Sequence, residues 1–199
     1  VEDSDAKLVA LKVLRRDLVD NPEHIDRLYD EAVMLAQLRH PNILLVDEVL
    51  HISGRPVIVM EWVRGVSLDR VLRGERGKVT LREAVEIARQ SALALQAAYE
   101  ATGPDGQPMH IVHRDVKPPN MVLDHGGRAL ITEFGLAVVD DGKLSMLCGT
   151  ENYQAPEMLQ GLGYGIAADI WAFGRIVRAV CAMEAVDPPP IAADTVCPW

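Results

Sequence analysis

Four side chains that could act on a phosphoryl group lie between residues 115 and 133: Asp115, Lys117, Asn120 and Glu133. A carboxylate such as Asp115 can orient a hydroxyl group and accept its proton. A lysine two residues later can neutralise negative charge that builds on a transferred group. Asn120 and Glu133 offer hard oxygen atoms, which magnesium prefers alongside phosphate oxygens. These residue types suit metal-assisted transfer of a phosphoryl group.

The sequence between Asn120 and Glu133 predicts a β-hairpin that brings their oxygens together. Two apolar runs flank the turn sequence Asp-His-Gly-Gly-Arg at residues 124–128. We expect Met121 to face Thr132 across the hairpin and Asn120 to face Glu133. Cβ atoms of such cross-strand neighbours lie about 5 Å apart. An amide oxygen and a carboxylate should therefore meet at the open end of the hairpin.

Two predicted helices must position this hairpin and loop. Asn21-Pro22 is a helix start signal, and apolar residues at 25, 28, 32 and 35 give one buried stripe. Thr80 to Glu83 reads as a capping box that opens a second helix to about Tyr99. Apolar or small residues at 81, 84, 85, 88, 92 and 95 predict the buried face of this second helix.

Bulk properties exclude several classes of protein. A chain of 199 residues can bury a sizeable core. Its net charge of −9 argues against a nucleic-acid-binding surface. No apolar run is long enough to span a membrane, and no signal peptide is recognisable. Cys148, Cys181 and Cys197 have neither disulfide-framework nor metal-site spacing, so we expect a reducing, cytoplasmic location. The sequence leaves the oligomeric state open.

Six motifs, in order along the chain, resemble those of Ser/Thr protein kinases. They are VALKVL at 9–14, Glu31 before RHPNI at 39–43, HRDVKPPN at 113–120, EFGLA at 133–137, GTENYQAPE at 149–157 and DIWAFG at 169–174. An HRD tripeptide alone carries little weight, but the ordered set covers nearly the whole chain. The length of the turn before HRD is similar to that of bacterial members of the family.

The resemblance implies an α+β fold with two lobes, similar to that of protein kinases. We expect a small antiparallel sheet plus one helix in the N-lobe, and a mainly helical C-lobe. Residues 1–63 would form an N-lobe remnant and the hinge, and residues 64–199 a partial C-lobe. The Gly-rich loop and the last C-lobe helices have no match, so a kinase domain truncated at both ends is expected.

Lys12 lies on a predicted strand over residues 7–14, where alternation places it on an otherwise apolar face. By resemblance, Lys12 contacts the α and β phosphates of ATP and pairs with Glu31. The plainer alternatives are a snorkelling lysine at a sheet edge and a surface pair between Glu31 and Arg27. Such a helix pair contributes only about 0.3 to 0.5 kcal/mol, so we favour the Lys12–Glu31 pair.

The segment from Met60 to Val63 resembles the hinge between the two lobes of the family. Met60 would be the gatekeeper residue. Backbone groups near Glu61 and Val63 would bind adenine. Side-chain identity matters little at such positions, so these assignments rest on resemblance alone.

By resemblance, HRDVKPPN is the catalytic loop. Asp115 would be the catalytic base and Lys117 would stabilise the transferred γ-phosphoryl group, with a lysine here typical of Ser/Thr rather than Tyr kinases. Asn120 and Glu133 would bind Mg²⁺. Thr150, in the segment that holds a protein substrate, would contact both Asp115 and Lys117. The implied cofactors are ATP and Mg²⁺, and the implied partner is a protein carrying Ser or Thr.

The remaining expectations concern regulation and support. Arg114 could pair with a phosphoserine, and Ser145 is the best phosphoacceptor candidate because Met146 occupies the usual slot. Asp169 is expected to start the last helix, where it either holds the HRD backbone or acts as an ordinary N-cap. We expect His113 and Phe134 to act by packing.

Glu133 departs from the family, which has aspartate at this position. The extra methylene moves the carboxylate by roughly 1 Å, and a shift of that size can cost about 10²-fold in rate. One alternative is therefore a pseudokinase, or inactive fragment, that acts as a nucleotide- or protein-binding scaffold. Small-molecule phosphotransferases share an aspartate and an asparagine in a similar loop, but GTENYQAPE at 149–157 favours a protein substrate.

Overall fold

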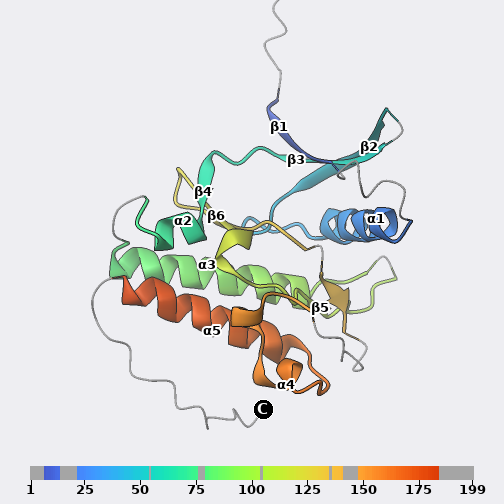
Figure 1. Ribbon diagram of the computed structural model, residues 1–199. Helices are drawn as coiled ribbons and strands as arrows, with labels where there is room; N and C mark the ends of the chain where they lie inside the picture. Colours follow the sequence, from blue (N-terminus) through green and yellow to red (C-terminus); the bar gives the residue numbers. More distant parts are fainter. Residues whose placement is uncertain are drawn as a thin grey trace, which may run out of the picture.

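The computed structural model describes residues 7–13, 22–53, 55–75, 79–103, 105–134, 136–140 and 148–183, without the side chains of residues 22–24, 27, 30 and 31. Figure 1 shows a small sheet with one helix above a mainly helical part. The predicted α+β arrangement, a small antiparallel sheet with one helix and a mainly helical second part, is confirmed. Within the described residues, no helix is both long and apolar enough to cross a lipid bilayer.

The sheet of the first part has three antiparallel strands in the order β1-β3-β2. These strands are β1 (Val9–Val13), β2 (Val46–Ile52) and β3 (Arg55–Glu61). Helix α1 (Pro22–Gln37) begins at the predicted proline. Three residues of its predicted stripe, Leu28, Ala32 and Leu35, are buried in one cluster with Val46 and Ile58 of the sheet. Helix α1 therefore covers one face of the sheet.

Lys12 lies on the helix-covered face of β1. It pairs across the sheet with Ile58, which is fully buried against α1. Its neighbours Leu11 and Val13 point to the opposite face and are exposed. The predicted inward projection of Lys12 is therefore confirmed.

The second part contains short strands, 3-10 turns and two long helices, which lie side by side in Figure 1. The strands are β4 (Gly65–Ser67), β5 (Ile111–Val112), β6 (Met121–Asp124), β7 (Ala129–Ile131) and β8 (Val138–Val139). The helices are α2 (Leu68–Leu72), α3 (Leu81–Tyr99), α4 (Pro156–Leu159) and α5 (Ile166–Ala182), and the 3-10 turns are η2 (Pro118–Asn120) and η3 (Glu151–Tyr153). Strands β4, β6 and β7 form one sheet, and β5 pairs with β8.

Helix α3 has the predicted N-terminus and a different buried face. The Thr80 hydroxyl accepts from the Glu83 amide, and the Glu83 carboxylate accepts from the Thr80 amide, so the capping box is confirmed. Leu81 and Val85, predicted to be buried, are 56% and 58% exposed. The buried residues are Ala84, Ile87, Gln90, Ser91, Ala94, Leu95 and Ala98. Polar residues contribute to this face because hydrogen bonds satisfy them, as when Ser91 Oγ donates to the Ile87 carbonyl.

The β6–β7 hairpin forms as predicted, but its register differs by one residue. Met121 pairs with Ile131 rather than Thr132. Asn120 consequently lies opposite Thr132, whose amide donates to the Asn120 carbonyl at 3.0 Å, and not opposite Glu133. The cause is a three-residue loop in which Gly127 has φ +84°, a left-handed conformation typical of such hairpins.

One hydrophobic cluster joins the two parts. It includes Leu35 of α1, Val46 of β2, Met121 of β6 and Phe134. The chain after α1 also bonds to the hairpin, since the Leu44 amide donates to the Ile131 carbonyl at 2.9 Å. The sheet that carries Lys12 is thereby held next to the hairpin that leads to Glu133.

Candidate active site

The Asp115 carboxylate is the centre of a group of hydrogen bonds in the predicted catalytic loop. Its Oδ2 atom lies 2.6 Å from Lys117 Nζ and 3.1 Å from Asn120 Nδ2. Its Oδ1 atom accepts a hydrogen bond from Thr150 Oγ1 at 2.8 Å. The short turn η2 produces this arrangement, because Pro118 starts it and it returns Asn120 toward Asp115.

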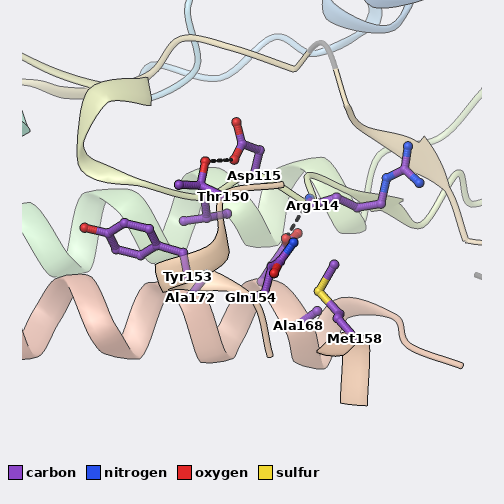
Figure 2. A pocket seen from close by; sticks show the side chains of 10 residues that line it. Arg114, Asp115, Thr150, Tyr153, Gln154, Met158, Ala168 and Ala172 are labelled. Carbon is purple, nitrogen blue, oxygen red and sulfur yellow. Dashed lines mark hydrogen bonds between the residues drawn. The ribbon is translucent and has the colours of Figure 1, made fainter. Parts of the chain in front are cut away.

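Thr150 reaches the loop from a segment more than thirty residues away in sequence. Its hydroxyl accepts from Lys117 Nζ at 2.8 Å and donates to Asp115, the bond drawn in Figure 2. Gly149, just before it, has φ +82°, and a Cβ there would overlap the Arg114 carbonyl oxygen. The predicted contacts of Thr150 with Asp115 and Lys117 are thus present, and they depend on the close approach of Gly149.

Asp169 holds the backbone of the loop from beneath. Its two carboxylate oxygens accept from the amides of His113 at 2.6 Å and Arg114 at 2.8 Å. Burial raises the pKa of Asp169 to about 6. Helix α5 begins at Ile166 with Gly165 as N-cap, so Asp169 does not start the helix. Of the two predicted roles, the bond to the HRD backbone is present and the N-cap role is wrong.

His113 and Phe134 pack against each other, as predicted. Their ring centroids are 4.6 Å apart, and each residue is only 1% exposed. Burial lowers the pKa of His113 to about 4, so its ring is neutral at pH 7. The Asp115 amide donates to His113 Nδ1 at 3.2 Å. His113 therefore fixes the loop through packing and one backbone bond.

The Arg114 guanidinium lies apart from this centre. In Figure 2 its side chain extends away from the Asp115–Thr150 pair. Nε donates to the Leu136 carbonyl at 2.5 Å, and Nη1 lies 3.4 Å from the Tyr164 hydroxyl. Ser145, the predicted phosphoacceptor, lies outside the described residues.

Asn120 and Glu133 line one open cavity of about 500 Å³, together with Asp115 and Lys117. Both bonds that Asn120 makes to Asp115 use its amide nitrogen, which leaves the amide oxygen to bind a metal. In the described ranges, no group of three His, Cys, Asp or Glu side chains could hold a metal ion. One carboxylate and one amide oxygen fit magnesium that is bound mainly through phosphate oxygens.

Lys12 and Glu133 form an ion pair that the sequence reasoning missed. Nζ and Oε2 are 2.6 Å apart, and both side chains are partly exposed. The side chain of Glu31, the predicted partner of Lys12, lies outside the described residues. The extra methylene of Glu133 was the signal in the sequence, because it extends the reach of the carboxylate. Lys12 therefore lies next to the predicted metal-binding carboxylate.

At the predicted hinge, Met60 is half-buried against the core cluster and pairs with Ala10 of β1. The Glu61 amide donates to the Leu45 carbonyl at 2.9 Å. The Glu61 carbonyl and the backbone of Val63 remain as candidate adenine-binding groups. The Glu61 side chain bonds to Arg128, which the sequence reasoning also missed.

Comparison with known proteins agrees with this geometry. The protein kinase domain family matches residues 1–188. The chain is 35% identical over 180 residues to serine/threonine-protein kinase DCLK1 of Rattus norvegicus. This alignment covers 88% of the present chain and 39% of that protein. It is 35% identical over 185 residues to serine/threonine-protein kinase PknA of Mycobacterium tuberculosis, an alignment that covers 88% of this chain and 41% of that protein. It is also 34% identical over 179 residues to CBL-interacting protein kinase 24 of Oryza sativa, with 87% of this chain and 37% of that protein covered.

These relatives come from an animal, a bacterium and a plant, and the chain spans about two fifths of the length of each. The matched region contains every described residue. The geometry around Asp115 and the family match over residues 1–188 lead to the same assignment. This chain belongs to the protein kinase domain family.

Proposed function

We propose that this chain transfers the γ-phosphoryl group of ATP to Ser and Thr hydroxyls of proteins. The observation that carries the proposal is the Asp115 carboxylate, held by Lys117 and Thr150 at the edge of the cavity that Asn120 and Glu133 share. Asp115 would orient the substrate hydroxyl and accept its proton. The substrate hydroxyl would replace the Thr150 hydroxyl as the hydrogen-bond donor to Asp115 Oδ1.

Lys117 and Lys12 would supply the positive charge that the transfer needs. Lys117 lies 2.6 Å from Asp115, close enough to offset charge building on the transferred group. Lys12 would contact the nucleotide phosphates. Its present bond to Glu133 is half-exposed, and bonds of that kind contribute little to stability, so the phosphates could replace it.

Asn120 and Glu133 would hold Mg²⁺ through an amide oxygen and a carboxylate, and the bound ion would neutralise charge on the phosphates. Met60 and the backbone near Glu61 and Val63 would receive the adenine. The lobes would comprise residues 1–63 and 64–199. A paired role for Arg114 and Ser145 in regulation, and a cytoplasmic location, stay predictions.

Asp115→Asn tests the catalytic role directly. Asparagine keeps the shape of the side chain but cannot serve as the base, so phosphate incorporation should fall by about 10² to 10⁴-fold. The measurement is transfer of labelled phosphate from Mg-ATP to the chain itself or to a generic basic protein. Asp105→Asn, in an exposed turn, is the matched control and should match the wild type. Equal incorporation by Asp115→Asn would refute the assignment.

The alternative function is a pseudokinase that binds nucleotide without transfer and keeps the Lys12–Glu133 pair. In that reading the pair occupies both the phosphate-binding and the metal-binding side chains. Thermal-shift titration with ATP, with and without magnesium, separates the two. The enzyme predicts a magnesium-dependent shift, and Glu133→Asp should then raise turnover by up to about 10²-fold. A shift that ignores magnesium, together with no gain in Glu133→Asp, would favour the pseudokinase.

A further inference from the structure

Arg128 connects three separate parts of the chain with three different nitrogen atoms. Nη2 donates to Glu61 Oε2 at 2.9 Å, and Nε donates to Asp124 Oδ2 at 3.1 Å. Nη1 approaches the Pro41 carbonyl at 3.5 Å. Asp124 belongs to the same hairpin turn, whereas Glu61 ends β3 and Pro41 lies in the loop after α1. Only the rigid, planar guanidinium group presents donors in these three directions at once.

Both oxygens of the Glu61 carboxylate accept hydrogen bonds, each from a different part of the chain. Oε2 takes the bond from Arg128, while Oε1 accepts the Leu45 amide at 2.9 Å. The Glu61 amide in turn donates to the Leu45 carbonyl. Glu61 is therefore fixed through its backbone to the sheet and through its side chain to the hairpin turn. Glu61 itself lies within the predicted hinge, residues 60–63.

A buried set of amides holds the same hairpin from its other side. Asn42 Nδ2 donates to the Ala129 carbonyl at 2.9 Å and to Gln90 Oε1 at 2.7 Å. Gln90 Oε1 also accepts the Ala129 amide, and Gln90 Nε2 donates to the Gly127 carbonyl. The turn is thus anchored to α3, so it provides a rigid support against which Arg128 can hold the hinge.

The plain alternative is an ordinary surface ion pair with no effect on ligand binding. Exposure argues against that alternative, because the side chains of Arg128, Glu61 and Asp124 are only 36%, 19% and 19% accessible. Burial lowers the pKa of Arg128, but the bonds to Glu61 and Asp124 outweigh this effect and raise the pKa above its usual value. The ion pair therefore joins the two parts of the molecule through side chains that are partly removed from solvent.

We infer that Arg128 is a positioning residue for nucleotide binding, which fixes the adenine-binding hinge relative to the hairpin through the Glu61 carboxylate. The inference rests on the proposed function, since it assumes that the hinge receives adenine. The hairpin leads to Asn120 and Glu133 at one end and carries Arg128 at the other. Arg128 thereby links the position of the adenine site to the part that holds the phosphates.

A double-mutant cycle on the full chain tests this role, with adenosine as the probe because it needs neither metal nor phosphate contacts. Arg128→Ala should raise the adenosine Kd by about tenfold, a typical effect of a direct coupling. Glu61→Gln should do the same, and it keeps an oxygen acceptor for the Leu45 amide. The double variant should bind no more weakly than the weaker single variant. Calorimetry well below every variant's Tm gives the Kd values.

Arg89→Ala is the matched control, because Arg89 forms a 2.6 Å pair with Glu86 on the surface of α3; its adenosine Kd should equal that of the wild type. An Arg128→Ala chain with a lower Tm and an unchanged Kd would overturn the inference, as would effects that multiply in the double variant. If Arg128→Ala does not fold, Glu61→Gln alone decides. A wild-type chain that does not bind adenosine overturns the proposed function, and the inference falls with it.

Discussion

Gly149 shows how one residue type permits the contacts around Asp115. Its φ of +82° is easily reached only by glycine, and its backbone approaches Arg114 too closely for a side chain. The next residue, Thr150, bridges Asp115 and Lys117. The position of Thr150 therefore depends on the missing Cβ of Gly149.

Gly149→Ala should reduce both stability and phosphate transfer. The left-handed conformation costs about 1 to 2 kcal/mol for a residue with a Cβ. Displacement of Thr150 by roughly 1 Å should cost about 10²-fold in kcat/KM. Urea unfolding and steady-state kinetics measure the two effects.

Gly106→Ala is the matched control for Gly149→Ala. Gly106 has a similar φ of +76°, but a Cβ there would meet nothing within 4 Å. It should show the loss of stability with unchanged kcat/KM. Equal kinetics in the two variants would contradict the proposed role of the close approach.

At the residue scale, the contacts of Thr150 in the predicted catalytic loop could be predicted, whereas the bond between Lys12 and Glu133 could not. The residue types of Asp115 and Lys117 pointed to phosphoryl transfer, and the resemblance of the surrounding motifs to the kinase family supplied the expected contacts of Thr150. The bond between Lys12 and Glu133 depends on the reach of one extra methylene in three dimensions. Motif comparison treats that change as a defect and does not say what the longer side chain contacts.

At the scale of elements, two predicted helix starts were correct, whereas the helix start at Asp169, the hairpin register and the buried face of α3 were not. The Thr80 capping box and Pro22 each began a helix where predicted. The hairpin register was off by one because Gly126 and Gly127 allow loops of more than one length. The face of α3 was misjudged because Gln90 is polar but buried, where hydrogen bonds to Asn42 and Ala129 satisfy it.

Thr80→Ala should destabilise the protein by about 1 kcal/mol, the usual cost of losing an N-cap side chain. Its hydroxyl bonds to both the amide and the carboxylate of Glu83, so both bonds disappear with it. The midpoint of urea unfolding measures this loss. Thr80→Ser keeps the hydroxyl and should remain within a few tenths of a kcal/mol of the wild type. An equal loss in both variants would mean that the methyl group, and not the cap, provides the stability.

At the scale of the whole molecule, two buried ionisable groups, Asp169 of α5 and His113 of the predicted catalytic loop, make stability respond to pH in opposite directions. The pKa of Asp169 is raised by burial to about 6, so its stabilising contribution is present below about pH 4 and is lost as pH rises toward 6. The pKa of His113 is lowered by burial to about 4, so its contribution is present above about pH 6.5 and is lost as pH falls toward 4. Each pKa shift corresponds to a change of about 3 kcal/mol in the free energy of unfolding. In the wild type, the two opposite changes of unfolding free energy with pH nearly cancel.

Substitution of either residue alone should reveal how the other one makes the free energy of unfolding depend on pH. Relative to the wild type, Asp169→Asn should lose about 3 kcal/mol of unfolding free energy as pH falls from 6.5 to 4, because only the His113 slope remains. His113→Phe should gain a similar amount over the same range, whatever its stability at pH 7. Urea unfolding at a series of pH values gives both differences, and the exposed carboxylates common to all chains cancel. Differences of the same sign, or differences that do not vary with pH, would show that the protonation of Asp169 and His113 does not set the pH dependence of stability in this way.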